Sequence, residues 1–211
     1  LATSPNGNGG WFSSLKNAGL LDLIHENGIE WLNVFAVDNV LQRIADPCFI
    51  GATITENRSV GAKVVCKNHP DEKVGVMCLK DNHPSIVEYY ELTPELRDAV
   101  DEDGEPAYNF GVILNYLFKE SELEDICENT LPLHIVEKKI PYIDDAGTLI
   151  KPEEPNGYKF ETLILDMIQM MDTCLPFEVE RDKEFAPIKN KTGIDSVESA
   201  RALLAKNGVT L

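Results

Sequence analysis

Hydrophobic residues near the start of the chain follow two patterns, one typical of a helix and the other typical of a buried strand. Apolar residues recur at helical intervals over residues 11–26, and Gly28 is a suitable residue for the end of a helix. Residues 31–37 (WLNVFAV) are almost continuously apolar, as is typical of a buried strand. A short helical pattern follows at 40–45. A helix, a strand and a helix in this order indicate an α/β protein.

The middle of the chain reads mainly as strands. Short polar segments rich in turn-forming residues separate the strand-like runs, and a longer buried run follows them. We therefore expect hairpins that extend the sheet. The runs are residues 49–55, 62–67, 74–80, 85–92 and 108–118.

The remaining segments add helices around that sheet. Residues 138–159 are rich in proline, glycine and charge, so we expect them to run over the surface. A short strand is expected at 176–180. The patterns predict helices at 93–100, 121–130, 160–173 and 195–208.

The amino-acid composition excludes some classes of function. The chain has 211 residues, of which 43% are hydrophobic, so it can bury a core of one domain or one domain with a small appendage. It carries 36 acidic and 19 basic side chains, for a net charge of -17. A nucleic-acid groove held by its own cations is therefore not expected. An acidic protein can still bind an anion through helix N-termini, a few lysines or a bound metal ion.

The cysteines and the hydropathy favour a cytoplasmic protein. The five cysteines are scattered, without the spacing of a zinc cluster or of a disulfide framework, which fits a reducing compartment. No apolar run approaches the roughly 20 residues needed to cross a bilayer, and the first residues lack a basic segment followed by an apolar stretch, so we expect a soluble protein that is not exported. Because the first residue is Leu1, we expect a piece of a longer chain.

A glycine-rich loop precedes the first helical segment. Residues 6–10 (NGNGG) hold two asparagines and three glycines. Glycine allows close approach of a ligand to the main chain, and a helix start directs unpaired N–H groups outward. The alternative, which these residues alone favour, is a simple turn that leads into a helix.

Two charged residues are candidates for phosphate chemistry. Asp38 follows an apolar strand, and ligand sites of open α/β sheets gather at the carboxyl ends of strands, where a carboxylate can hold Mg²⁺ beside phosphates. The alternative is that Asp38 caps a helix at 40–45. Lys189 lies among loop residues, where a lone lysine is ordinarily a solvated cation.

Two further residues are ambiguous by themselves. Glu88 lies in a strand-like run on the same face as Tyr90, and its carboxylate could accept hydrogen bonds from sugar hydroxyls or line an exposed face. Gly75 interrupts another strand-like run, which indicates a bulge or a close approach to the backbone.

A series of short segments, taken in order, resembles the eukaryotic-type UDP-N-acetylglucosamine pyrophosphorylases and the related UDP-sugar pyrophosphorylases. The resemblance covers nearly the whole chain. It implies a Rossmann-like, GT-A-like nucleotidyltransferase fold with a mixed sheet flanked by helices. It also implies a uridylyltransferase that forms a UDP-sugar and pyrophosphate from UTP and a sugar 1-phosphate with Mg²⁺. The segments are PNGNGG, FAVDN, ADPCFIGA, GAKVV, VGVMC, VEYYE, KKIPYID, KPEEPNGYKFE and EFAPIKN.

The resemblance assigns roles to residues of the nucleotide side. Gly7 and Asn8 match positions that contact the uridine part. Asp38 matches the aspartate of the family's VDN motif, beside metal and phosphate, and Lys189 matches a lysine that contacts phosphate. These matches imply catalytic roles for Asp38 and Lys189 and a metal-binding role for Asp38.

On the sugar side, Gly75 and Glu88 match positions that meet the sugar. Val112 departs from the family pattern, because it stands where the N-acetylglucosamine enzymes have an asparagine that reaches the sugar. A valine makes no hydrogen bond, so glucose 1-phosphate is as good a candidate as N-acetylglucosamine 1-phosphate. Asn109 and Asn115 are possible substitutes for the missing asparagine.

The second departure from the family pattern is a missing loop. The family's GGxGTRLG-like loop, which wraps the triphosphate, is absent from these 211 residues. We therefore expect residues 1–190 to be the C-terminal part of the catalytic domain, 191–211 to be a helical tail, and the piece to be inactive alone. The alternatives are a noncatalytic nucleotide-sugar-binding or regulatory module and a structural α/β domain.

Overall fold

A six-stranded mixed sheet forms the body of the protein. The computed structural model describes residues 5–127 and 130–210. The strands of the sheet are β1 (Trp31–Phe35), β2 (Val60–Cys66), β3 (Val76–Lys80), β4 (His83–Val87), β5 (Phe110–Lys119) and β10 (Cys174–Glu178). Their order is β10-β2-β5-β3-β4, and β1 also pairs with β5. The β10–β2 pair is parallel and the other pairs are antiparallel.

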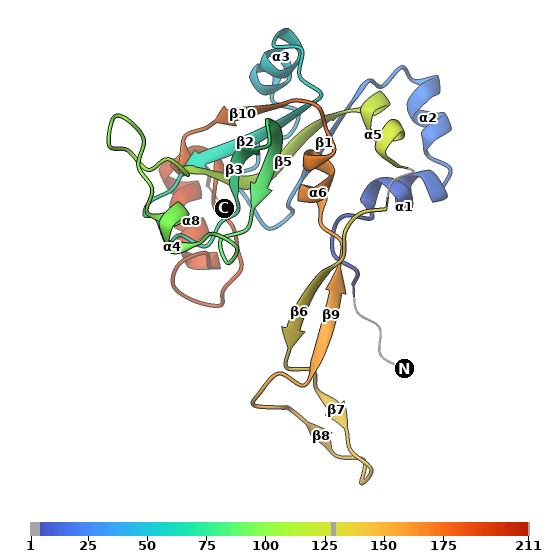
Figure 1. Cartoon of the computed structure of the whole chain (residues 1–211), viewed down its shortest axis with the longest axis vertical. Coiled ribbons are helices and arrows are strands. Elements are labelled where there is room, and N and C mark those ends of the chain that lie inside the picture. The colour runs from blue at the N-terminus through green and yellow to red at the C-terminus, as the bar shows by residue number, and fades with distance from the viewer. Residues whose placement is uncertain (1–4, 128–129, 211) are drawn as a thin grey trace.

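Short helices surround this sheet (Figure 1). They are α1 (Trp11–Asn17), α2 (Leu21–Glu26), α3 (Pro47–Thr55), α4 (Pro94–Arg97), α5 (Glu120–Cys127), α6 (Ile164–Gln169), α7 (Arg181–Glu184) and α8 (Val197–Lys206). Helix α1 contacts α5, α3 contacts β2, and α6 packs against β4. The expected α/β class, with a mixed sheet flanked by helices, is confirmed.

A two-part hairpin arm, residues 134–161, projects from the body (Figure 1). Strands β6 (His134–Lys138) and β9 (Gly157–Glu161) pair next to the body, and β7 (Tyr142–Ile143) and β8 (Leu149–Ile150) pair beyond them. The segment at 138–159 is mostly exposed, as expected, and it contains two short hairpin pairings that the sequence did not predict. The helix expected at 160–173 is shorter than predicted, because β9 occupies its first residues and α6 begins at Ile164.

The main core lies between the sheet and the helices at its side. Its buried members include Val60 and Val64 of β2, Phe118 of β5, and Ile168 of α6. A smaller cluster joins α8 to the body through Ala200, Leu41 and Ala186. The expected helix at 195–208 is thus present and packed against the body.

The prediction of a strand at 49–55 was wrong. These residues form α3, because the Asp46 side chain accepts a hydrogen bond from the Cys48 backbone N–H and Pro47 occupies the first helical position. Residues 40–45 form turns rather than a helix. The helix expected at 11–26 is divided into α1 and α2, with Gly19 at φ +71° between them. Of the helix expected at 121–130, residues 128–129 lie outside the described residues.

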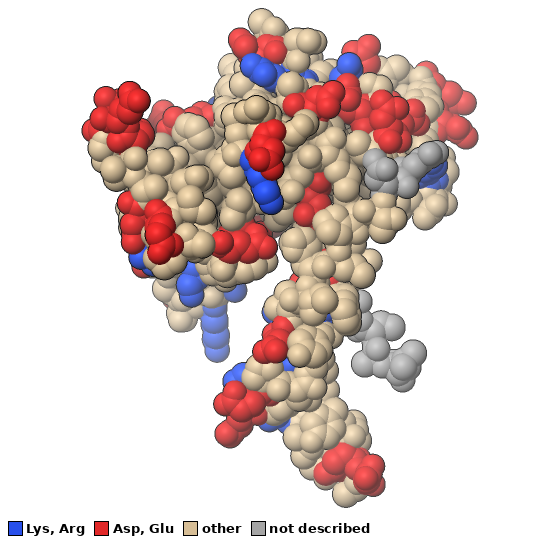
Figure 2. All heavy atoms as spheres, in the orientation of Figure 1, with Lys and Arg blue, Asp and Glu red and all other residues tan. Residues whose placement is uncertain are grey.

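Surface properties agree with the composition. Acidic side chains are spread over the face shown in Figure 2, with fewer basic ones among them. All five cysteines are free thiols. Within the described ranges, every helix is too short or too polar to traverse a bilayer.

The close packing of α3 on β2 depends on Gly61. A methyl group added at this position would lie 2.5 Å from Thr53 Oγ1 and 2.7 Å from the Phe49 ring. Gly61→Ala should therefore lower the free energy of unfolding by about 1–3 kcal/mol, measured by denaturant titration. Gly51→Ala is the matched control, because nothing lies within 4 Å of a methyl group there. In a helix interior this change should raise stability by about 0.5–1 kcal/mol. Equal stabilities of the two variants would contradict the packing argument.

Candidate functional site

A break in the regular pairing of β5 opens a gap at one edge of the strand. Against β2, the register passes from Ala62↔Tyr116 to Val64↔Val112, so β2 advances two residues while β5 advances four. Leu114, inside this bulge, has φ +50°. On the other edge of β5, the first half of this strand pairs with β3 and the second half pairs with β1. The bulge lies between these two halves.

The end of β1 and the start of β3 consequently lie next to one another along β5. At the end of β1, the Ala36 N–H donates to Leu114 O (2.9 Å). Ahead of β3, Gly75 O accepts from the Val112 N–H (2.9 Å). The chain therefore leaves the sheet after β1 at the place where it enters β3. This arrangement resembles the strand-end crevices at which α/β proteins bind ligands.

A cavity of roughly 320 Å³ lies at this place, and we call it the central cavity. Its walls come from the opening loop, the strand ends, the start of α6 and the segment after α7. Six of the seven residues that the sequence singled out line it, although they come from distant parts of the chain. These are Asn8, Asp38, Gly75, Glu88, Val112 and Lys189.

Gly7 is the exception, because it docks the opening loop instead of lining the cavity. Its φ is +78°, and a Cβ there would lie 2.2 Å from Thr162 O. The Gly9 N–H donates to the same oxygen (2.9 Å). Asn8 Oδ1 accepts from the Ile164 N–H at the start of α6 (2.9 Å). The loop is therefore a turn that leads into α1 and also brings Asn8 to the cavity.

Asp38 and Lys189 are brought together by neighbouring segments. The Ile188 N–H donates to Asp38 O (2.9 Å), so the two loops run side by side. Because residues 40–45 form turns, the alternative that Asp38 caps a helix there was wrong. Among the described residues, neither the Asp38 carboxylate nor the Lys189 ammonium has a hydrogen-bond or ion-pair partner. Both side chains are thus available to a ligand.

Glu88 lies directly after β4, half-buried at the cavity wall. Burial raises the pKa of its carboxyl group, and the nearby Glu91 charge raises this pKa further, while His134 and Lys189 act in the opposite direction. Gly75 is close to this residue, since a Cβ on Gly75 would lie 3.8 Å from Glu88 Cδ and 3.4 Å from Val112 Cγ2. The expected close approach at Gly75 is therefore made by side chains of the cavity wall.

Sequence reasoning missed other residues of the cavity. Lys73 is an exposed lysine at its rim, and Tyr116 is an almost fully buried residue of its wall. The only sequence signal for Lys73 is its place two residues before Gly75. With these additions the charged lining residues are two carboxylates, Asp38 and Glu88, and two lysines, Lys73 and Lys189.

This set of groups suits a ligand that carries both phosphates and hydroxyls. Ammonium groups attract phosphate oxygens, and carboxylates accept hydrogen bonds from hydroxyls. The donor set also fits Mg²⁺, because this ion is commonly bound through one or two carboxylates together with substrate phosphates, and Asp38 offers an unpaired carboxylate.

One other group of metal-ligand type is present in the described ranges. His25, Glu120 and Glu124 place their ligand atoms within 4.8 Å of one another. These side chains already pair, since His25 Nε2 lies 3.1 Å from Glu120 Oε1 and 3.4 Å from Glu124 Oε1. The group connects α2 to α5 and contributes no residue to the central cavity.

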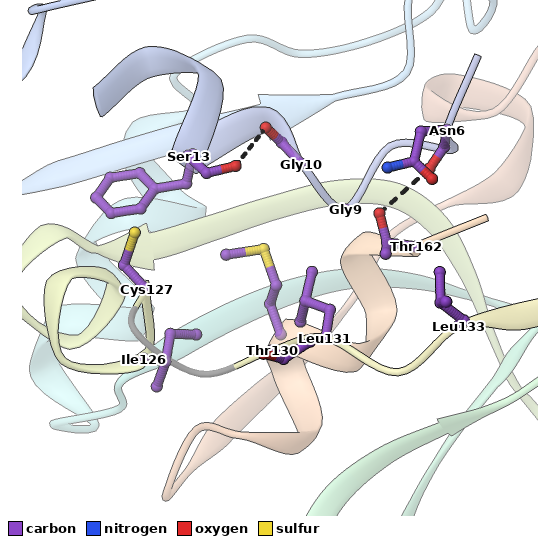
Figure 3. A pocket seen from close by; sticks show the side chains of 12 residues that line it. Asn6, Gly9, Gly10, Ser13, Ile126, Cys127, Thr130, Leu131, Leu133 and Thr162 are labelled. Atoms are coloured by element: carbon purple, nitrogen blue, oxygen red, sulfur yellow. Dashed lines mark hydrogen bonds between the residues drawn. The ribbon is translucent and has the colours of Figure 1, made fainter. Parts of the chain in front are cut away.

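A second cavity, of roughly 300 Å³, uses other residues of the opening loop (Figure 3). Asn6, Gly9 and Gly10 line it together with α1, the end of α5 and Met167 of α6. Figure 3 shows Ser13 and Thr162 hydrogen-bonded to backbone oxygens of the loop. No charged side chain is among the lining residues that the structure describes. It therefore does not suit a phosphate chain.

The fold is the nucleotidyltransferase fold of solved UDP-sugar pyrophosphorylases. The crystal structure of the uridine diphosphate N-acetylglucosamine pyrophosphorylase from Trypanosoma brucei superposes with a TM-score of 0.82 at 28% sequence identity, over 96% of this chain and 42% of that one. The family model described as UTP–glucose-1-phosphate uridylyltransferase matches residues 1–210, and the chain therefore belongs to this family of UDP-sugar pyrophosphorylases.

Curated relatives agree with this membership. A UDP-N-acetylhexosamine pyrophosphorylase-like protein 1 from Mus musculus is 40% identical over 98% of this chain. The UDP-N-acetylglucosamine pyrophosphorylase of Saccharomyces cerevisiae is 38% identical over 100% of it. The chain spans 42% and 46% of the lengths of these two relatives.

The raised pKa of Glu88 generates a prediction about stability. A raised carboxyl pKa means that the folded state holds its proton to higher pH than the unfolded state, whose value is near 4.5. The contribution of Glu88 to stability is complete below that pH and is lost as pH rises through the folded-state pKa. Glu88→Gln should therefore become progressively more stable relative to the parent between pH 4 and pH 7.

Denaturant unfolding at several pH values measures this trend. Glu105→Gln, on an exposed loop, is the control for the removal of one acidic group. A stability difference between Glu88→Gln and the parent that does not change with pH would contradict the prediction.

Proposed function

We propose that the full-length protein containing this chain is a uridylyltransferase, which forms a UDP-sugar and pyrophosphate from UTP and a sugar 1-phosphate. This chain would supply the sugar side and the metal side of its site. The observation that carries the proposal is the convergence of Asp38, Glu88 and Lys189, unpaired by described residues, on one cavity. The family membership and the names of the relatives support the same reaction.

The reaction needs charge neutralisation more than proton transfer. An oxygen of the sugar phosphate attacks the α-phosphorus of UTP, a new P–O bond forms, and the bond to the β-phosphate oxygen breaks as pyrophosphate leaves. The attacking phosphate is already ionised near neutral pH, so no general base is required. Positioning and electrostatic stabilisation of the phosphates therefore account for catalysis.

Different residues of the central cavity would bind the phosphates, the sugar and the metal ion. Lys189 and Lys73 would bind phosphate oxygens, Glu88 would accept hydrogen bonds from the sugar, and Gly75 leaves room beside it. Asp38 would hold Mg²⁺, which when bound supplies positive charge to the phosphates. We propose a cytoplasmic location, which the five free thiols support.

We further propose that position 112 sets the sugar preference. Val112 lies on the cavity wall, and its side chain offers no hydrogen bond. The two nearby asparagines do not replace this function. Asn109 Oδ1 accepts from the Lys67 N–H (2.9 Å). Asn115 is bonded to Gln42 (2.7 Å) and Asn33 (2.8 Å), and neither asparagine is among the lining residues. Glucose 1-phosphate and N-acetylglucosamine 1-phosphate are therefore both candidate substrates.

Substitution of Asp38 or Lys189 tests the reaction. In the full-length protein, Asp38→Ala and Lys189→Ala should each lower the rate of pyrophosphate release from UTP and a sugar 1-phosphate by about 100-fold or more, because each removes a group that stabilises phosphate charge. Lys191→Ala, at a nearby exposed lysine, is the control and should stay active. A fully active Asp38→Ala variant would reject the proposed metal site.

The same assay distinguishes the alternative function. This chain alone should release no pyrophosphate. A thermal shift of the full-length protein with UDP-sugar and Mg²⁺, but no turnover with any sugar 1-phosphate, would identify a noncatalytic binding module instead. The absence of both binding and turnover would indicate a structural domain.

Restoration of an asparagine tests the sugar assignment. Val112→Asn should raise kcat/KM for N-acetylglucosamine 1-phosphate relative to glucose 1-phosphate by roughly tenfold, because one hydrogen bond to a buried polar group contributes about 1–3 kcal/mol. Val112→Leu provides an apolar control. An unchanged ratio of the two kcat/KM values in Val112→Asn would show that this position does not set the preference.

A further inference from the structure

One charged residue of the sheet is completely enclosed. The Lys63 side chain, in β2, has 0% of its surface exposed. Its ammonium lies 2.8 Å from Asp46 Oδ2 and 2.5 Å from Glu184 Oε2, and both of these carboxylates are also buried. Lys63 therefore compensates two negative charges at once in the interior. We call Lys63, Asp46 and Glu184 the buried triad.

The two carboxylates belong to the two segments that carry the charged residues of the cavity. Asp46 ends the loop on which Asp38 lies, and Glu184 begins the segment that leads to Lys189. Lys63, from the sheet, ties both segments to β2. The triad thus connects the cavity loops to the most buried part of the fold.

Asn39 joins the same two segments directly. This side chain is 3% exposed, and its Nδ2 donates to Glu184 O (2.7 Å). Its Oδ1 accepts from the N–H groups of Ala186 (2.8 Å) and Leu41 (3.3 Å). The amide side chain therefore bonds to backbone on both sides of the contact.

Backbone hydrogen bonds complete the connection. The Val40 N–H donates to Ala186 O (3.3 Å), and the Ile188 N–H donates to Asp38 O (2.9 Å). Residues 38–40 and 186–188 thus run antiparallel, with Asp38 and Lys189 at one end of the contact and the buried triad near the other.

We propose that Lys63 and Asn39 are positioning residues that hold Asp38 against Lys189 at the central cavity. This inference rests on the proposed function, because it assigns the two residues to the same reaction. Neither residue needs to touch a substrate. Loss of the Lys63 ammonium would leave two buried carboxylates that repel each other, one on each loop, and so would separate the loops. Arg43 also lies near both carboxylates, 3.9 Å from Asp46 and 3.5 Å from Glu184, but it is more than half exposed and farther from each than Lys63, so its charge compensates them less.

A stabilising role alone would not require ions here. Well-packed apolar residues often stabilise an interior as much as a buried ion pair does, whereas in some proteins a buried ion pair is retained because it fixes the geometry of its partners. The positioning role therefore predicts a loss of alignment even in a variant that remains folded.

The test uses the full-length protein and a triad without charges. The triple variant Lys63→Met, Asp46→Asn, Glu184→Gln leaves no unpaired charge in the interior, since Arg43, which loses both carboxylate partners, is more than half exposed. Asparagine keeps the cap of α3. Asn39→Ala is the second variant. Lys206→Met, which removes the exposed ion pair between Lys206 and Asp182, is the control.

Amide hydrogen exchange gives the first readout, independent of catalysis. The amides of Val40 and Ile188 should exchange at least tenfold faster in both test variants, while amides of the β2–β5 ladder and the control stay as in the parent. Unchanged exchange at Val40 and Ile188 in both test variants would overturn the inference.

Kinetics give the second readout. In both test variants kcat should fall at least tenfold and the Mg²⁺ concentration for half-maximal rate should rise. The KM for the sugar 1-phosphate should change less than threefold, because no hydrogen bond or ion pair joins the triad side chains to Gly75, Glu88 or Val112 within the described part of the chain. An unchanged kcat in variants with faster exchange would overturn the positioning role. A parent protein without uridylyltransferase activity would instead overturn the proposed function.

Discussion

The bulge in β5 is the constraint on which the site depends. A strand of regular geometry would pair with one neighbour along its whole edge, and β1 or β3 would be excluded. At Leu114 the backbone takes a left-handed conformation, which costs a non-glycine residue about 1–2 kcal/mol. The change of backbone direction at this residue ends the ladder between β1 and β5 and allows β3 to pair with the same edge of β5. Bulges commonly re-aim strands beside active sites.

Local charge, and not net charge, decides what the central cavity attracts. The molecule carries a net charge of -17, yet screening limits the reach of exposed charges to about 8–10 Å at physiological salt. Distant acidic side chains therefore have little effect on a bound phosphate. The ammonium groups of Lys73 and Lys189 and an ion held by Asp38 act directly in the cavity. An acidic protein can thus bind an anionic nucleotide if these few groups converge.

The elements that the sequence predicts best are those with a single dominant signal. The strand-like run at 62–67 and the longer buried run at 108–118 predicted β2 and β5, and the helical pattern at 195–208 predicted α8. Helix α3 was mistaken for a strand because its apolar, β-branched run outweighed the start signal of Asp46 and Pro47. The bulge at Leu114 has no sequence signal, since neither glycine nor proline marks it.

The residues of the site could be located only partly. Asp38, Glu88 and Lys189 were ambiguous from local pattern, and the family resemblance selected them. Lys73 and Tyr116 were missed, because their place at the cavity depends on contacts between segments far apart in sequence. The buried triad was missed because its three residues lie far apart in sequence and because a lysine in a strand pattern ordinarily indicates the exposed face.

The contrast between Lys63 and Lys189 separates structural charge from functional charge. Lys63 is buried and paired with two carboxylates, so its charge acts only on groups inside the protein. Lys189, like Asp38 and Glu88, has no ion-pair partner among the described residues and faces a cavity. Unpaired charges and a carboxyl group of raised pKa reduce the stability of the folded state. A ligand that pairs with them would recover that stability, because binding to the folded state alone raises the free energy of unfolding.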